Sequence, residues 1–259
     1  MLRDAKPKAI DKANSGSEGV DAHEGVLYIC GTPIGNLEDA SFRLIDVLNQ
    51  VDLILCEDTR RTLKLLTHYG IRKPLWPFPE HIEEDRTTMV LDHLFQGKAV
   101  ALVSDAGMPL ISDPGAYLIR AVREHGIKIA SVPGPSAVTT ALALSGFYAS
   151  QFNFAGFPPR KPRKRQGFFA QWIKPDVPVV FFESPYRLLK CLADLMEVFP
   201  AIQVSLCHEM TKVYEGAIIG PVQEIYAQMQ DSRIQGEWVI VAYLDSRQNQ
   251  EEAEDSASL

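Results

Sequence analysis

The chain has 259 residues, of which 46% are hydrophobic and 23% charged, and its formal net charge is −7 at pH 7. This length suffices for one large domain or two smaller ones, and the hydrophobic share excludes global disorder. The overall charge gives no sign of nucleic-acid binding. However, residues 245–259 alone hold five acids against one arginine, so the rest of the chain is nearer neutral. The net charge of the whole chain therefore does not give the charge of any one surface.

Both ends of the chain are polar and lack an apolar segment of helix length. We expect residues 1–24 to form a flexible N-terminal arm and residues 246–259 an acidic disordered tail. No apolar run approaches the ~18 residues needed to span a bilayer. The four cysteines are far apart without a C-x-x-C pair, which favours buried thiols over metal ligands. A cytoplasmic protein without metal or membrane contact is expected.

From residue 25 onward, short apolar runs alternate with amphipathic segments. Strands are predicted at 26–30, 52–56, 99–103 and 128–132. Helices are predicted at 41–49, 61–68 and 115–125, with another after Pro135. Continuous apolar strands alternating with helices indicate a parallel sheet that is covered on both faces. We therefore predict an N-terminal α/β domain over residues 25–146.

Glycine and proline then crowd together, and we predict a linker over residues 147–165. Beyond it, strands are predicted at 177–182, 202–206, 217–219 and 238–244, with helices at 186–199 and 221–230. This order mixes strands and helices without strict alternation. It predicts a C-terminal mixed α/β domain over residues 166–245.

Three connections after predicted strands have an unusual composition: Gly31–Asn36, Ser104–Gly115 and Pro133–Ser136. In parallel α/β sheets, ligands bind beyond the carboxyl ends of the strands. Glycine lets the backbone approach a ligand closely, and proline fixes a loop without adding a donor. Any one connection is explained as a tight turn, but the three together indicate a ligand site.

The same connections lack both common phosphate-binding patterns, G-x-x-x-x-G-K-[ST] and G-x-G-x-x-G. They are rich in proline and alanine, and Asp105 is the one acid of the stretch Ser104–Pro109. This composition suits a neutral or cationic ligand that takes hydrogen bonds from the backbone. It does not by itself name the ligand.

A series of motifs in this order resembles the ribosomal RNA small-subunit methyltransferase I family, within the tetrapyrrole methylase superfamily. The resemblance covers about residues 26–244. The motifs are Leu27–Leu37, Glu57–Arg60, Ser104–Gly107, Ser112–Gly115, Pro133–Ala137, Phe182–Pro185 and Glu209–Lys212.

This resemblance implies two α/β domains with S-adenosylmethionine in the cleft between them, usually in a homodimer. It also implies 2′-O-methylation of a cytidine ribose in 16S ribosomal RNA, either free or in the assembled small subunit. The cofactor contacts that it implies are Pro33, Asp105, Ala106, Gly107, Met108, Pro109, Ser112, Ser136, Ala137, Phe182 and Leu206.

Methyl transfer from a sulfonium is an in-line displacement, in which positioning supplies much of the rate. A ribose hydroxyl is a weak nucleophile, so a base or a cation near it helps. The catalytic candidates are Glu57, Arg60 and Glu183. For Glu57, direct proton transfer and orientation of Arg60 or Arg61 both remain open.

The run 160–165 is the strongest nucleic-acid signal, because five of its six residues are basic. Nearby aromatic residues either stack on unpaired bases or belong to the core: Phe157, Phe168, Phe169 and Trp172. The predicted RNA-binding residues are Arg160, Lys161, Arg163, Lys164, Arg165, Arg187 and Lys212.

The sequence departs from the family pattern at Met108, Tyr186, His208 and Gln235, and in the segment 78–83. Several of these are positions expected to face RNA. Two alternatives therefore stay open. One is a methyltransferase acting on a tetrapyrrole, whose carboxylates would also attract basic residues. The other is a non-catalytic RNA-binding member of the fold.

Overall fold

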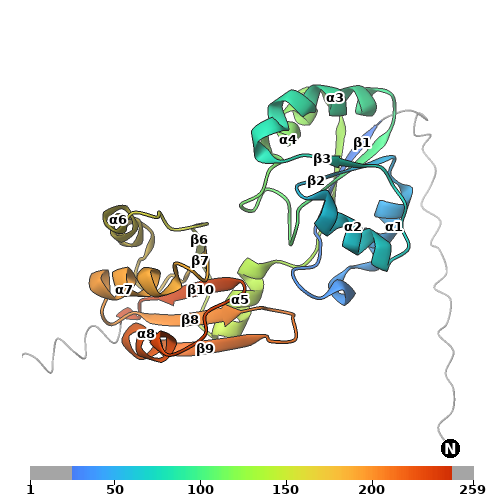
Figure 1. Ribbon diagram of the computed structural model, residues 1–259. Coiled ribbons are helices and arrows are strands. Elements are labelled where there is room, and N and C mark those ends of the chain that lie inside the picture. Colours follow the sequence, from blue (N-terminus) through green and yellow to red (C-terminus); the bar gives the residue numbers. More distant parts are fainter. Residues whose placement is uncertain (1–24, 247–259) are drawn as a thin grey trace, which may run out of the picture.

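The computed structural model describes residues 25–246 and contains two five-stranded sheets, each with helices on both faces (Figure 1). Residues 1–24 and 247–259 lie outside the described part, so the predicted arm and almost all of the predicted acidic tail do too. The predicted α/β class, with a parallel sheet followed by a mixed one, is confirmed.

The first sheet is wholly parallel and has the order β3-β2-β4-β1-β5. Its strands are β1 Val26–Cys30, β2 Leu53–Cys56, β3 Leu75–Pro77, β4 Ala99–Val103 and β5 Lys128–Val132. Alternate side chains enter different cores: Leu27 and Ile29 pack on one face of the sheet, and Cys30 on the other. Burial of both faces explains why the inner strands β1, β2 and β4 read as continuous apolar runs.

Two helices cover each face of this sheet. They are α1 Phe42–Gln50 and α2 Thr59–His68 on one face, and α3 Glu83–Phe95 and α4 Ala116–Glu124 on the other. Short 3₁₀ turns precede α1 at Leu37–Asp39 and α3 at Glu80–Ile82. The Ser41 and Asp58 side chains cap α1 and α2, each accepting a backbone N–H bond. The buried Glu83 carboxylate accepts from the amides of Tyr117 and Leu118 at the start of α4.

The second sheet has the order β6-β7-β10-β8-β9, and only the β6–β7 pair is parallel. Its strands are β6 Asn153–Phe154, β7 Val179–Glu183, β8 Gln203–His208, β9 Gly216–Pro221 and β10 Trp238–Tyr243. One face carries α6 Pro162–Trp172, α7 Leu188–Val198 and α8 Val222–Gln230, and the other carries α5 Ala137–Ser145. Phe181 packs in the three-helix face and Val180 in the α5 face.

The domain boundary predicted at residue 146 needs correction, because α5 packs against β7, β8 and β10 of the second sheet. Its buried residues Val138, Ala141 and Leu142 share a core with that sheet. The predicted linker 147–165 contains β6, which pairs with β7, and the start of α6. We propose that the first lobe comprises residues 25–136 and the second lobe residues 137–246.

Candidate active site

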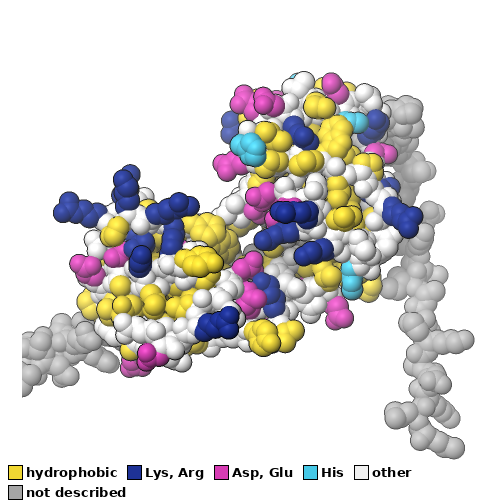
Figure 2. All heavy atoms as spheres, in the orientation of Figure 1, with side chains coloured by type: hydrophobic (Ala, Val, Ile, Leu, Met, Phe, Trp, Pro, Cys, Tyr) yellow, Lys and Arg dark blue, Asp and Glu magenta, His cyan; other side chains and the backbone are white. Residues whose placement is uncertain are grey.

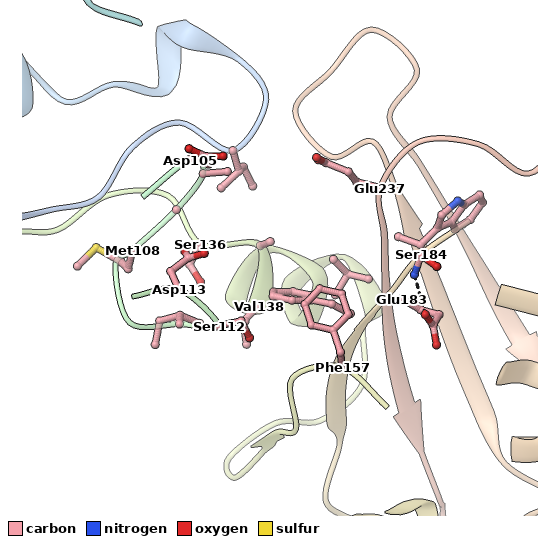
Figure 3. Close-up of a pocket in the computed structure, with 18 of the residues that line it drawn as sticks. Asp105, Met108, Ser112, Asp113, Ser136, Val138, Phe157, Glu183, Ser184 and Glu237 are labelled. Atoms are coloured by element: carbon pink, nitrogen blue, oxygen red, sulfur yellow. Dashed lines mark hydrogen bonds between the residues drawn. The ribbon is translucent and has the colours of Figure 1, made fainter. Parts of the chain in front are cut away.

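A cavity of about 440 Å³ lies between the two lobes. Figure 3 shows Asp105, Asp113 and Ser136 on the first-lobe side, facing Phe157 and Glu237 across the space. The first-lobe wall comes from the connections after β1, β2, β4 and β5. The second-lobe wall comes from the start of α5, the segment that carries Phe157, the carboxyl end of β7 and the amino end of β10. The cavity therefore lies beyond the carboxyl ends of the parallel strands, as the composition of the loops predicts.

The three glycine- and proline-rich connections are fastened to one another. Thr32 and Gly107 exchange backbone bonds, with N–O distances of 2.9 and 3.1 Å. At Gly31, an added Cβ would lie 2.7 Å from the Gly134 nitrogen, so the first and third connections touch backbone to backbone. Gly107 has a φ of +85°, which favours glycine. Glycine is thus needed here for close approach as well as for turning.

Asp105 joins the β4 connection to the start of α2. Its carboxylate accepts a bond from the Asp58 amide at 3.0 Å and lies 3.5 Å from Nε of Arg61. Because Asp58 also caps α2, the helix start and the β4 connection have a fixed relative position. Arg61 and Asp105 both line the cavity.

Three carboxylates face the cavity from the first lobe: Glu57, Asp105 and Asp113. Burial, followed by the charges of Glu57 and Asp105, raises the pKa of Asp113 to about 6. Burial and the Asp105 charge also raise the pKa of Glu57. These carboxyl groups repel one another, so a cation bound among them would lower the energy of their ionised forms.

Glu183 is fully occupied by partners within the second lobe. Its carboxylate accepts bonds from Nε and Nη2 of Arg187, at 2.6 and 2.7 Å, and from the Ser184 amide at 2.7 Å. Its side chain has no solvent exposure. Charge-assisted hydrogen bonds to a guanidinium are strong and fix the position of a carboxylate. Glu183 lines the cavity at the end of β7, where these bonds fix its carboxylate, and a catalytic role for it stays a prediction.

Comparison with known families and proteins decides where this chain belongs. The family model of the Tetrapyrrole (Corrin/Porphyrin) Methylases matches residues 26–226. A "Ribosomal RNA small subunit methyltransferase I" from Thermotoga maritima is 46% identical over 84% of this chain and 97% of its own length. A protein of the same name from Neisseria meningitidis serogroup B is 42% identical over 90% of this chain and 81% of its own.

The chain belongs to the ribosomal RNA small subunit methyltransferase I family. Its fold is also that of a uroporphyrin-III C-methyltransferase from Thermus thermophilus, with a TM-score of 0.60 at 19% identity. That likeness covers 85% of this chain and 94% of the other. The family and its relatives' names support methyltransferase activity.

Most of the cofactor contacts implied by the family resemblance line the cavity: Asp105, Ala106, Gly107, Met108, Ser112, Ser136, Ala137 and Phe182. Pro33, Pro109 and Leu206 are not among the lining residues. Leu206 lies on β8 with its side chain buried in the core under α7 and α8, so only its backbone is left for any contact. The family resemblance thus identifies most of the first-lobe loops that line the cavity. The second-lobe wall is known mainly from the tertiary structure.

Several lining residues were not predicted from the sequence, and they come from both lobes: Ile34, Arg61, Ile111, Asp113, Val138, Phe157, Ser184, Pro185 and Gly236–Val239. Asp113 and Ile34 lie inside motifs already noted. Gly236–Val239 stand far along the chain, and no local signal marks them.

The basic candidate beside the cavity is Arg61 rather than Arg60. Arg60 does not line the cavity; its side chain is 87% exposed and pairs with Asp58 at 2.7 Å. Successive residues on a helix point about 100° apart, so only one of the two neighbours faces the cleft. Arg60 as a catalytic residue is therefore not supported by its position.

The predicted basic run divides into exposed and buried members. Arg160, Lys161, Arg163 and Lys164 are exposed, and Figure 2 shows basic side chains gathered over α6. Arg165 is 2% exposed and pairs with Asp194, with its Nε at 2.6 Å from the carboxylate. The prediction that Arg165 contacts RNA is wrong, because its guanidinium lies inside the second lobe.

Two other predicted RNA contacts also have internal partners. Arg187 binds Glu183 and the Pro158 carbonyl. Lys212 bridges the carboxylates of Glu209 and Glu237 at 2.9 and 2.8 Å. Of the nearby aromatic residues, Phe168, Phe169 and Trp172 belong to or pack on the second-lobe core. Only Phe157 reaches the cavity.

Within residues 25–246, His, Cys, Asp and Glu side chains do not gather in threes in a way suited to a metal ion. Over the same residues, none of the helices has the length and apolar character needed to cross a membrane.

Proposed function

We propose that this protein transfers a methyl group from S-adenosylmethionine to the 2′-oxygen of a cytidine ribose in small-subunit (16S) ribosomal RNA. The observation that carries the proposal is the position of the cavity, which has an acidic first-lobe wall beside an exposed basic surface. Names of relatives at 42–46% identity support ribosomal RNA as the substrate.

The residues present fit S-adenosylmethionine. A cavity of about 440 Å³ is in the range that holds small cofactors. Its wall combines apolar side chains such as Ile34 and Val138 with backbone groups of the loop 105–108. Glu57, Asp105 and Asp113 supply negative charge for a cationic ligand. When bound, the cofactor would supply an electrophilic methyl carbon on a positively charged sulfur.

The protein's own contribution is positioning and charge. The interlocked connections around Gly31, Gly107 and Gly134 form a fixed wall that holds a donor in one orientation. Glu57 faces the cavity with a raised pKa, which brings a carboxylate closer to the range useful for accepting the ribose hydroxyl proton. Arg61 holds Asp105 and presents a cation at the same wall.

Recognition of RNA is proposed for the exposed basic residues Arg160, Lys161, Arg163 and Lys164. Phosphate neutralisation by such a surface dominates RNA affinity. The family resemblance also leads us to propose a homodimer, which sedimentation analysis of the full chain tests.

The deciding experiment incubates the protein with methyl-labelled S-adenosylmethionine and undermethylated small subunits, followed by nucleoside mass spectrometry. The expected product is 2′-O-methylcytidine at one position. Labelling of a base, or none at all, would contradict the proposal. Parallel reactions with naked 16S RNA and with uroporphyrinogen separate free RNA, the assembled subunit and a tetrapyrrole as substrates. Calorimetry with S-adenosylmethionine tests for a non-catalytic RNA-binding protein, which would show no heat of binding.

A further inference from the structure

Two exposed aromatic side chains of the second lobe stand in or directly beside segments that line the cavity. Phe157 is 58% exposed and lines the cavity, and Tyr186 is 93% exposed, directly after the lining residue Pro185. Most other aromatic residues of this lobe lie in or against its core. Leaving two such rings in water is costly by comparison with burying them.

The backbone segments that carry these two rings are tied together. Arg187, next to Tyr186, donates from Nη2 to the Pro158 carbonyl at 2.8 Å, and Pro158 follows Phe157. The same guanidinium is held by the buried Glu183 carboxylate. The rings are thus presented from neighbouring, fixed segments rather than from one mobile loop.

A second set of contacts fixes the segment between Phe157 and the basic surface. Nη1 of the buried Arg165 lies 3.4 Å from the Pro159 carbonyl and 3.3 Å from that of Arg160. The Gly156 carbonyl accepts from the Phe182 amide at 2.8 Å, and the Phe157 and Phe182 rings pack edge to face with centroids 5.5 Å apart. The buried Arg165 and the partly buried Arg187 therefore hold this segment, which exposes an aromatic side chain at Phe157 and then basic side chains.

We infer that Phe157 and Tyr186 form a stacking platform for unpaired bases of the RNA substrate. This inference rests on the proposed function. Exposed aromatic rings beside a row of cations are the combination that binds single-stranded RNA, since the rings stack on bases while the cations meet the phosphates. Arg160 and Lys161 stand three and four residues after Phe157 and supply those cations. The bound ribose would then lie at the cavity mouth, facing Glu57 on the opposite wall.

The test compares Phe157→Ala and Tyr186→Ala with Tyr186→Phe, which keeps the ring. Phe42→Ala is the control, because Phe42 is 93% exposed on α1 of the first lobe and outside the cavity. The probe is a short, fluorescently labelled single-stranded oligocytidylate, titrated at several salt concentrations. Methyl transfer to small subunits and calorimetry with S-adenosylmethionine are measured on the same variants.

We expect each Ala variant to bind the oligonucleotide about 5- to 100-fold more weakly, with an unchanged dependence on salt. Arg160→Gln should instead reduce the number of ions released on oligonucleotide binding by about one, which appears as a weaker dependence of the affinity on salt. Tyr186→Phe and Phe42→Ala should bind the oligonucleotide as the unmodified protein does, and the variants at Tyr186, Arg160 and Phe42, which lie outside the cavity lining, should keep their affinity for S-adenosylmethionine.

Several results would overturn the inference. Unchanged oligonucleotide binding by both Ala variants is one. Weakened binding of S-adenosylmethionine alone would assign Phe157 to the cofactor, and a changed sedimentation coefficient would assign the rings to a contact between copies. If the unmodified protein methylates ribosomal RNA and the Ala variants do so with the same kcat/KM, only the platform fails. If the unmodified protein neither binds nor methylates RNA, the proposed function fails with it.

Discussion

The Asn36 amide donates a hydrogen bond to Oγ1 of Thr211, at 3.0 Å, and so joins the first lobe to the second. Gly35 touches the same segment: an added Cβ would lie 2.6 Å from that oxygen and 2.7 Å from the Met210 carbonyl. Lys212, the residue after Thr211, forms an ion pair with Glu237 on the cavity wall. The Glu209–Lys212 motif thus contributes to the spacing of the two lobes.

Gly35→Ala is expected to force the lobes apart, because the clash is with backbone as well as side-chain atoms. We expect a loss of about 1–3 kcal/mol in the free energy of unfolding and weaker binding of S-adenosylmethionine. Denaturant titration and calorimetry measure the two effects. Gly167→Ala is the control: a Cβ there meets nothing within 4 Å, and alanine favours the α6 helix. Unchanged binding in Gly35→Ala would show that the contact does not set the cavity.

Asp113→Asn is expected to stabilise the protein above pH 6 but not at pH 4. The pKa of Asp113 is raised in the folded state to about 6 from 3.8, so the folded protein binds this proton more tightly than the unfolded chain does. The stabilisation that comes from the protonated Asp113 carboxyl is therefore greatest below pH 4 and is lost as the pH rises through 6. Thermal melts at pH 4 and pH 8 test this, with Asp46→Asn on α1 as the charge-matched control. An equal shift in Tm at both pH values would contradict it.

Arg163→Gln and Arg165→Met should act on different properties although the residues are two positions apart. Arg165→Met leaves Asp194 without its partner inside the second lobe, and we expect a loss of about 3–5 kcal/mol in stability. Arg163 is exposed, so Arg163→Gln should leave stability unchanged and lower the salt dependence of RNA binding by about one ion. Urea unfolding and RNA titrations decide between them. If Arg165→Met were as stable as the unmodified protein and its RNA binding depended less on salt, Arg165 would be shown to contact RNA.

Glu57→Gln should lower kcat by about 10²–10⁴-fold if the carboxylate accepts the ribose proton. The unmodified enzyme should then gain rate with pH through the raised pKa of Glu57, and the variant should lose this rise. Measurements of kcat against pH on small subunits test both expectations. Glu84→Gln, exposed on α3, controls for the change in charge. A variant with full kcat and a raised KM would instead make Glu57 a residue that orients the substrate.

The strands of the first sheet could be predicted from the sequence because their signal is local. Strands β1, β4 and β5 have the predicted bounds. In the inner strands β1 and β4, burial of both faces demands an uninterrupted apolar run, whereas β5 is an edge strand in which Lys128 and Ser131 are exposed. β3 was missed because it has three residues, one of them Pro77. α3 was missed although its first turn carries three acids, a helix-start signal.

The sequence by itself determined the fold class and the rim of the site, because glycine and proline spacing and apolar runs act over a few residues. Only the tertiary structure decided which side chains were free to act. Arg160 and Arg165 look alike in the sequence, but one is exposed and the other is buried against Asp194. Likewise, Glu57 and Glu183 both line the cavity, but only the Glu183 carboxylate is paired with an arginine of its own lobe, Arg187. Such partners come from distant elements, so no local pattern records them.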